Sequence, residues 1–166
     1  MSSGEKKETD AVAMSKEYFD RAYRYQMEGK LKHAARCYLR SIELHPTPEA
    51  HTFLGWTYSF TGRYDEAIAE CKKAIEVDPA FGNPYNDIGA YLVETAKYEE
   101  AVPWLTKAVA AERYEPRHYP HFNLGRVYEI QGKWADAMAE YQKAIELFPE
   151  YSLAIEALDR LKARLN

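Results

Sequence analysis

The chain carries Leu54-Gly55-Trp56-Thr57-Tyr58, and a close copy of this pentapeptide returns as Leu124-Gly125-Arg126-Val127-Tyr128. A diverged form, Ile88-Gly89-Ala90-Tyr91-Leu92, lies between the two. Self-similarity with a period of about 34 residues is typical of repeat proteins, in which each helical pair buries its apolar stripe only against neighbouring copies. The repetition therefore predicts an all-α fold, a right-handed α-solenoid of stacked helix-turn-helix repeats with a long exposed groove.

Apolar residues recur at helical spacing from Ser15 onward, and no period-two segment is long enough for a strand. The pattern predicts one solenoid domain with four repeats, over residues 15–47, 48–81, 82–117 and 118–151. A capping helix would follow at residues 152–166, apolar toward the fourth repeat and charged toward water. The expected helices cover residues 15–28, 30–44, 48–60, 64–77, 84–95, 98–112, 120–131, 134–147 and 151–165.

Residues 1–14 are polar and carry no helical apolar stripe, so we expect a flexible N-terminal tail. Thr47 and Asn83 each precede a proline and are expected to cap the N-terminus of the following helix. Glycines stand where a helix is expected to end in a left-handed residue, and Ala96 takes that place in the third pair. These glycines are Gly29, Gly62 and Gly132.

The junction between the third and fourth repeats is longer than the others. The equivalent alanines Ala34, Ala67, Ala101 and Ala137 are separated by 33, 34 and 36 residues. The extra length falls in residues 113–121, and the third repeat also has Arg113 where a closing proline would stand.

The repeated pattern resembles that of the tetratricopeptide repeats, in which a bulky residue, Leu-Gly, Tyr, Ala, an aromatic residue, Ala and Pro follow one another. The resemblance covers about residues 15–151, and the first and third repeats are the more diverged. It implies that the first helix of each pair lines a concave face that binds other proteins. The second repeat carries Leu54, Gly55, Tyr58, Gly62, Tyr64, Ala67, Ala74 and Pro79. The fourth carries Leu124, Gly125, Tyr128, Gly132, Trp134, Ala137, Tyr141, Ala144 and Pro149.

Large rings are concentrated at the positions of this face that the packing pattern does not use. Water-facing helix positions usually hold Lys, Glu or Gln, so these rings indicate a recognition surface, although each ring could instead stack on a neighbouring helix. The candidate rings are Phe19, Tyr23, Phe53, Trp56, Phe60, Tyr119 and Phe122, and the polar candidates in the later repeats are Asn86, Asp87, Asn123 and Arg126.

This division predicts a peptide ligand whose apolar side chains bind the first half of the groove, while amides and Arg126 hold its backbone or a carboxylate in the second. The Lys and Asn pattern of the two-carboxylate clamp for chaperone C-termini is absent in either register. Trp104 is a second candidate, for a contact on the convex side, because its equivalents are Glu70 and Glu140 and suggest a solvent-facing position. The alternative is that the indole lies flat over its own helical pair.

Bulk composition disfavours several other functions. The net charge is -4 and basic and acidic residues alternate, which argues against a nucleic-acid partner. No apolar run could span a bilayer and no signal peptide is evident, so we expect a cytoplasmic protein without a membrane partner. Cys37 and Cys71 are expected to be reduced thiols, and neither has the surroundings of a nucleophile.

We expect no catalytic residues, no cofactor and no metal. His118 and His121 are close enough to share a helical face with Glu115 as a third ligand, but surface or turn histidines are the favoured interpretation. The sequence therefore predicts a non-catalytic adaptor that binds another protein or peptide. The alternative is a self-associating scaffold, in which the tail or capping helix of one copy fills the groove of another.

Overall fold

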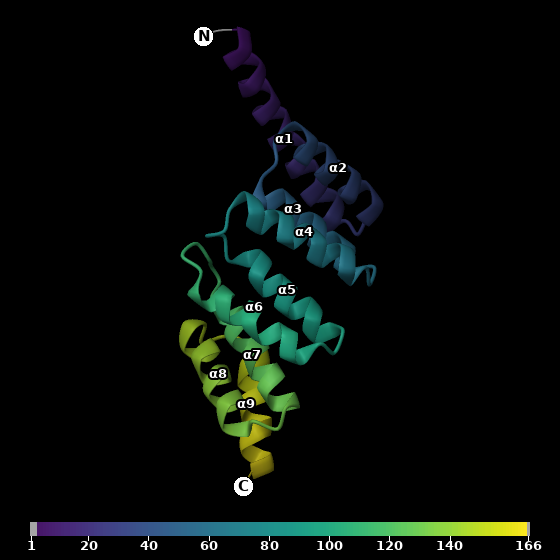
Figure 1. Ribbon diagram of the computed structural model, residues 1–166. Helices are drawn as coiled ribbons and strands as arrows, with labels where there is room; N and C mark the ends of the chain where they lie inside the picture. Colours follow the sequence, from purple (N-terminus) through teal and green to yellow (C-terminus); the bar gives the residue numbers. More distant parts are fainter. Residues whose placement is uncertain (1–2, 166) are drawn as a thin grey trace. The chain divides into compact units, whose positions relative to one another are not determined.

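The computed structural model describes residues 3–165, which contain nine helices and no strand (Figure 1). The helices are arranged as helix-turn-helix pairs, as the repeats predict. They group into two compact units, one up to Pro79 with four helices and one from Ala80 with five. The helices are α1 (Ser3–Met27), α2 (Leu31–Leu44), α3 (Pro48–Ser59), α4 (Tyr64–Val77), α5 (Asn83–Glu94), α6 (Tyr98–Ala110), α7 (His118–Ile130), α8 (Trp134–Leu147) and α9 (Ser152–Leu165).

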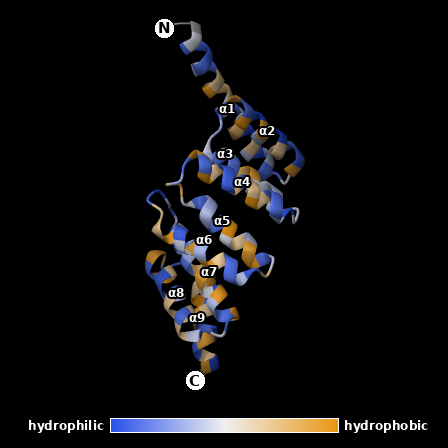
Figure 2. Ribbon diagram, viewed as in Figure 1, coloured by the Kyte–Doolittle hydropathy of each residue, from blue (hydrophilic) through white to orange (hydrophobic). Residues whose placement is uncertain are grey.

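Each helix mixes hydrophilic and hydrophobic residues along its length (Figure 2), and the apolar ones meet inside the unit to which the helix belongs. In the first unit one core cluster contains Ala22, Ala34, Tyr38 and Leu54. In the second unit α9 closes the end of the fourth repeat, because its apolar residues pack on α8. This second cluster contains Ala137, Tyr141, Ala157, Leu158 and Leu161.

The Leu-Gly motif requires glycine because the two helices of a pair approach each other closely at this position. A Cβ atom added at Gly125 would lie 2.5 Å from the ring of the fully buried Tyr141. At Gly55 the same atom would lie 2.8 Å from the Ala67 carbonyl oxygen. Any side chain at these positions would separate α3 from α4 or α7 from α8.

The turns within the pairs confirm the expected left-handed residues, with φ of 72°, 72° and 73° at the three glycines and 60° at Ala96. Thr47 caps α3 as predicted, since its hydroxyl accepts a hydrogen bond from the Ala50 N–H. The predicted cap at Asn83 is wrong, because Asn83 is itself the first residue of α5 and follows Gly82 in a helical conformation. The Gly82 N–H donates to the carbonyl of Arg113, so α5 begins one residue early.

The expected flexible tail is also wrong for residues 3–14, which continue α1 as an exposed helix; residues 1 and 2 lie outside the described residues. The segment is rich in Glu, Lys and Ala, which have high helix propensity. A packed helix already supplies the nucleus, so each further residue adds a backbone hydrogen bond without a nucleation cost. An apolar stripe is required for packing but not for this extension.

The lengthened junction folds back on the start of α5. Arg113 donates its N–H to the Ala80 carbonyl, and its guanidinium stands 4.6 Å from the Phe81 ring centroid. Arg117 donates to the carbonyls of Val109 and Ala111, at the end of α6. Together these contacts hold Tyr114 in a buried position.

Among the described helices, none combines the length and the hydropathy that crossing a bilayer requires.

Candidate functional site

In the first unit, the predicted rings form one continuous series, which we call the aromatic row: Phe19, Tyr23, Phe53, Trp56 and Phe60. Phe53 of α3 contacts Phe19 and Tyr23 of α1, with ring centroids 5.4 and 5.8 Å apart. Trp56 continues the row, 5.7 Å from Phe53 and 5.2 Å from Phe60. Each ring thus stacks on another, as the alternative interpretation required.

Stacking does not bury the whole row. Phe19 and Phe53 pack against the core around Tyr38 and are half-buried. Tyr23 and Phe60 are 42% and 57% exposed, and Trp56 is half-buried between Phe53 and Phe60. The row therefore has a packed base and an exposed edge, and that edge is what a ligand would contact.

In the second unit, the predicted polar residues bind one another. The Asn123 amide donates to the Asn86 side-chain oxygen at 3.1 Å, and both residues are buried. Arg126 donates to Asn123 at 3.4 Å and to Glu94 at 3.0 Å. Some of the side-chain donors and acceptors that we expected to bind a peptide backbone are thus already hydrogen-bonded to other residues of the protein. Asp87, also on α5, is half-buried beside Asn86.

The two predicted rings of α7 belong to a second aromatic cluster. Phe122 packs between Tyr141 and Tyr151, with centroids 5.7 and 5.2 Å away. Tyr119 is 41% exposed and meets Tyr151 edge to face, at 5.7 Å and 90°. Phe122 is thus mainly a packing residue, whereas Tyr119 is available to a ligand.

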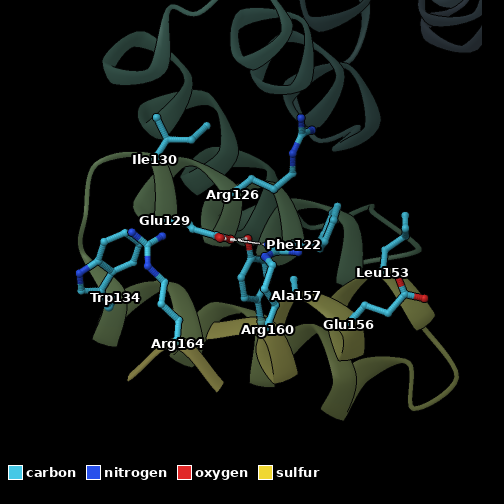
Figure 3. Close-up of a pocket in the computed structure, with 11 residues that line it drawn as sticks. Phe122, Arg126, Glu129, Ile130, Trp134, Leu153, Glu156, Ala157, Arg160 and Arg164 are labelled. Carbon is cyan, nitrogen blue, oxygen red and sulfur yellow. Dashed lines mark hydrogen bonds and ion pairs between the residues drawn. The ribbon is translucent and has the colours of Figure 1, made fainter. Parts of the chain in front are cut away.

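The second unit also contains an open pocket of about 630 Å³ between α7, the start of α8 and α9 (Figure 3). Glu129 lies inside it, accepting the Tyr141 hydroxyl at 2.7 Å and two hydrogen bonds from Arg160 at 2.9 and 3.0 Å. Arg164 stands over the Trp134 ring at 4.7 Å. The lining residues are Phe122, Arg126, Glu129, Ile130, Trp134, Tyr141, Leu153, Glu156, Ala157, Arg160 and Arg164.

Sequence reasoning missed this pocket because it assigned Arg160 and Arg164 to the solvent face of a cap. A signal was nevertheless present. Arg160 follows Arg126 by 34 residues, and Arg164 follows Ile130 by 34 residues. The capping helix α9 therefore repeats the pattern of a first helix, and its equivalent face lines the pocket.

Trp104 lies against its own helical pair. Its ring is 6.1 Å from that of Tyr85, and Lys107 stands 5.0 Å above it. Its equivalents Glu70 and Glu140 are largely shielded from water by their pairs with histidines, so this position does not require a solvent-facing side chain. Trp104 itself is half-buried, and a contact on the convex side stays a prediction.

The histidines considered for metal binding have separate surroundings. His118 is buried against the rings of Tyr119, Phe148 and Tyr151, and burial lowers its pKa. His121 instead lies 2.6 Å from a carboxylate oxygen of Glu140. No group of three potential metal ligands occurs within residues 3–165. Neither cysteine forms a disulfide, and burial raises the pKa of the Cys37 thiol.

Models of the tetratricopeptide repeat match residues 48–81 and 118–151, the second and fourth repeats. With the helical pairs and the Leu-Gly contacts, these matches define the class, and the chain belongs to the tetratricopeptide repeat family. The fold indicates a scaffold for protein–protein interactions.

Relatives share the repeats over limited lengths. Small glutamine-rich tetratricopeptide repeat-containing protein 2 of Mycosarcoma maydis is 34% identical over 80 residues, which is 48% of this chain and 23% of that protein. Superkiller complex protein 3 of Homo sapiens is 28% identical over 104 residues, covering 63% of this chain and 6% of that protein. The chain thus spans less than a quarter of the length of these relatives.

Solved structures share the fold at low identity. The chain is similar to pilF of Pseudomonas aeruginosa, with a TM-score of 0.87, 23% identity and coverage of 93% of this chain and 70% of that one. It is also similar to MamA, with a TM-score of 0.73, 23% identity and coverage of 89% and 80%. These similarities establish the arrangement of helices and leave the ligand to be inferred from side chains.

Proposed function

We propose that the protein is an adaptor that binds a peptide segment of another protein along the first-helix faces of its repeats. The exposed edge of the aromatic row carries this proposal. Tyr23 of α1, Trp56 of α3 and Phe60, directly after α3, present ring surface along one row, although the core of the unit is already filled beneath them. Clustered aromatic side chains of this kind are typical centres of protein interfaces.

The second unit supports the same role with different chemistry. Its pocket combines apolar surface from Ile130 and Leu153 with the guanidinium groups of Arg160 and Arg164. A peptide that places apolar side chains on these surfaces would also find hydrogen-bond donors for its carbonyls or carboxylates. Binding of this kind requires no catalytic group. The absence of nucleic-acid and membrane partners and a cytoplasmic location stay predictions.

The test begins with peptides selected from a random twelve-residue display library on the wild-type chain. Their dissociation constants are then measured by fluorescence polarisation on a variant with Tyr23→Ala, Trp56→Ala and Phe60→Ala. We expect at least a tenfold loss of affinity, about 1.4 kcal/mol. The matched control is Leu39→Ala, which removes an exposed apolar side chain from α2. Equal affinities for the aromatic variant and the control would refute the proposal, as would a selection that yields no binders.

Self-association is the second candidate, and exposed apolar residues near the C-terminal end favour it. Leu147, Phe148 and Leu153 are each between 41% and 52% exposed around the α8–α9 turn. An exposed apolar patch at the end of a repeat array can bind a second copy of the same protein. Sedimentation equilibrium at micromolar concentration separates the two functions. A monomer supports the adaptor, and a mass that rises with concentration and falls on Leu153→Glu supports the scaffold.

A further inference from the structure

Asp87 is an acid without a counterion. It occupies the position on α5 that Asn123 holds on α7, 36 residues later, and it is half-buried. Its one hydrogen bond is from the Asn86 amide at 3.5 Å, and it has no cationic partner among residues 3–165. Arg126, the nearby cation of this face, is already bound to Glu94 and Asn123. Carboxylates removed from water are usually paired, so an unpaired one indicates a site for a ligand.

Tyr114 lies near this carboxylate, and two further tyrosines lie near Tyr114. Tyr114 comes from the lengthened junction, Tyr119 from the first turn of α7 and Tyr151 from the turn before α9. Burial raises the pKa of Tyr114, and the Asp87 carboxylate and the hydroxyls of Tyr119 and Tyr151 raise it further, so Tyr114 lies near each of these three groups. The perpendicular rings of Tyr119 and Tyr151 form two walls.

The junction creates this arrangement. Gly82 approaches Tyr114 so closely that a Cβ atom added there would stand 2.3 Å from the tyrosine Cβ. The paired backbones of Gly82 and Arg113 fix that approach. The additional length of the third junction therefore brings a tyrosine to the start of α5, where Asp87 lies one helical turn further along.

We propose that Asp87, together with the tyrosines near Tyr114, binds a basic side chain, arginine or lysine, of the peptide. The carboxylate supplies the counter-charge, and the face of the exposed Tyr119 ring attracts a cation placed within about 6 Å of its centroid. A guanidinium would also bind the carboxylate through two parallel N–H donors. This inference rests on the proposed adaptor function and names the chemistry that its ligand brings to the second unit.

The ionisation of Asp87 supplies an independent readout. Burial, only partly opposed by the Asn86 hydrogen bond, raises the pKa of Asp87 to about 7. The other ionisable groups near Asp87 include Tyr114, Tyr119, Tyr151, His118 and the ion pair of Arg126 with Glu94. A bound cation would lower the Asp87 pKa, so binding at pH 7 should release about half a proton per peptide.

The main experiment uses the display-selected peptides and the variant Asp87→Asn, which keeps the shape and removes the charge. We expect Arg or Lys to be enriched at one peptide position, and Asp87→Asn to weaken binding at least tenfold. Replacing that basic residue by Gln should weaken binding to the wild type equally, and should cause no further loss with Asp87→Asn. Glu99→Gln, an exposed acid in the first turn of α6, is the matched control and should bind as the wild type does.

Calorimetric titration in phosphate and in Tris buffer measures the released proton, which should disappear in Asp87→Asn. Unchanged affinity and unchanged proton release in Asp87→Asn would overturn the inference. The proposed function would then still stand if the variant of the aromatic row had lost binding, so the two failures are distinguishable. A melting midpoint of Asp87→Asn at or above that of the wild type confirms that the variant folds, because an unpaired buried charge is removed.

Discussion

Glu70 is expected to be a principal electrostatic support of the first unit. Its side chain is 10% exposed and accepts hydrogen bonds from His51 at 2.7 Å and from Lys73 at 2.6 Å. Burial raises the pKa of Glu70, but the bonds from His51 and Lys73 outweigh it, and the resulting pKa lies below the usual value. The charged carboxylate is therefore the form that the fold stabilises.

Glu70→Ala should lower the stability of the first unit by about 2–3 kcal/mol. The change leaves His51 without its acceptor in a buried position, while the exposed Lys73 returns to water. For a unit of 79 residues each kcal/mol shifts the melting midpoint by about 4–8 °C, so we expect a decrease of roughly 8–24 °C. In the third repeat the equivalent positions hold Tyr85 and Trp104, whose rings contact each other, so two aromatic side chains can take the place of the histidine and the acid. The combined change His51→Tyr and Glu70→Trp should therefore restore most of the loss.

The effect of Glu70 should depend on pH with a defined sign. Its pKa in the folded state is depressed, so its contribution is present above the ordinary value of 4.5 and is lost as pH falls through the folded-state pKa. The midpoint difference between the wild type and Glu70→Ala should thus be largest at pH 7 and shrink below pH 4.5. Thermal unfolding followed by far-ultraviolet circular dichroism at pH 7 and pH 3 measures both values.

Glu76→Ala is the matched control, because Glu76 is exposed on the same helix. The reasoning fails if Glu70→Ala lowers the midpoint no more than Glu76→Ala does. It also fails if the difference between wild type and Glu70→Ala is the same at pH 3 as at pH 7, since the loss would then come from packing and not from the charged pair.

Three further changes test the local structure. Gly125→Ala should lower stability by about 1–3 kcal/mol in urea unfolding, because the new methyl group meets Tyr141 at 2.5 Å; an unchanged midpoint would contradict the close approach. Ala96→Gly should raise stability by about 0.5–1 kcal/mol, since the residue has φ of 60°, and a loss would show that this turn is relaxed. Deleting residues 3–14 should reduce the helical signal but leave the melting midpoint within a few degrees, because that part of α1 is mostly exposed; a large decrease would mean that it packs on the unit.

Most helices could be predicted from sequence because glycine and proline residues mark the helix ends in several repeats. The bounds of α4 and α8 agree with the expected ones at both ends, since a left-handed glycine precedes each helix and a proline follows it. The start of α1 could not be found in this way. A solvent-exposed extension of a helix requires only residues of high helix propensity. It has no apolar periodicity, which is the signal used to locate helices in the sequence.

The candidate site was predicted less completely, because burial of a polar residue depends on a partner that periodicity does not reveal. Glu70 looked like a solvent-facing position, yet it is buried through His51, 19 residues earlier. The same reasoning placed Trp104 at a solvent-facing position by analogy with Glu70. The pocket beside Arg160 was missed for another reason, because the charged side of α9 was expected to face only water. The sequence placed the rings of the aromatic row on one face and the structure brings them into contact, but the sequence could not tell the packed base of the row from its exposed edge.

The third repeat shows how such departures can produce specificity on a shared fold. It has Tyr85 and Trp104 where the second and fourth repeats have a histidine–glutamate pair. Its junction is also longer, because equivalent positions of the third and fourth repeats are 36 residues apart, whereas those of the second and third are 34 apart. The first change keeps the helical pair packed with different chemistry. The second brings Tyr114 to an acid that the repeat pattern does not require. Positions that every copy needs for stacking are constrained by burial, so a partner can be selected only by residues outside that set. Asp87 and its tyrosines are outside it, and for this reason we expect a change there to alter which peptide binds while the repeats remain folded.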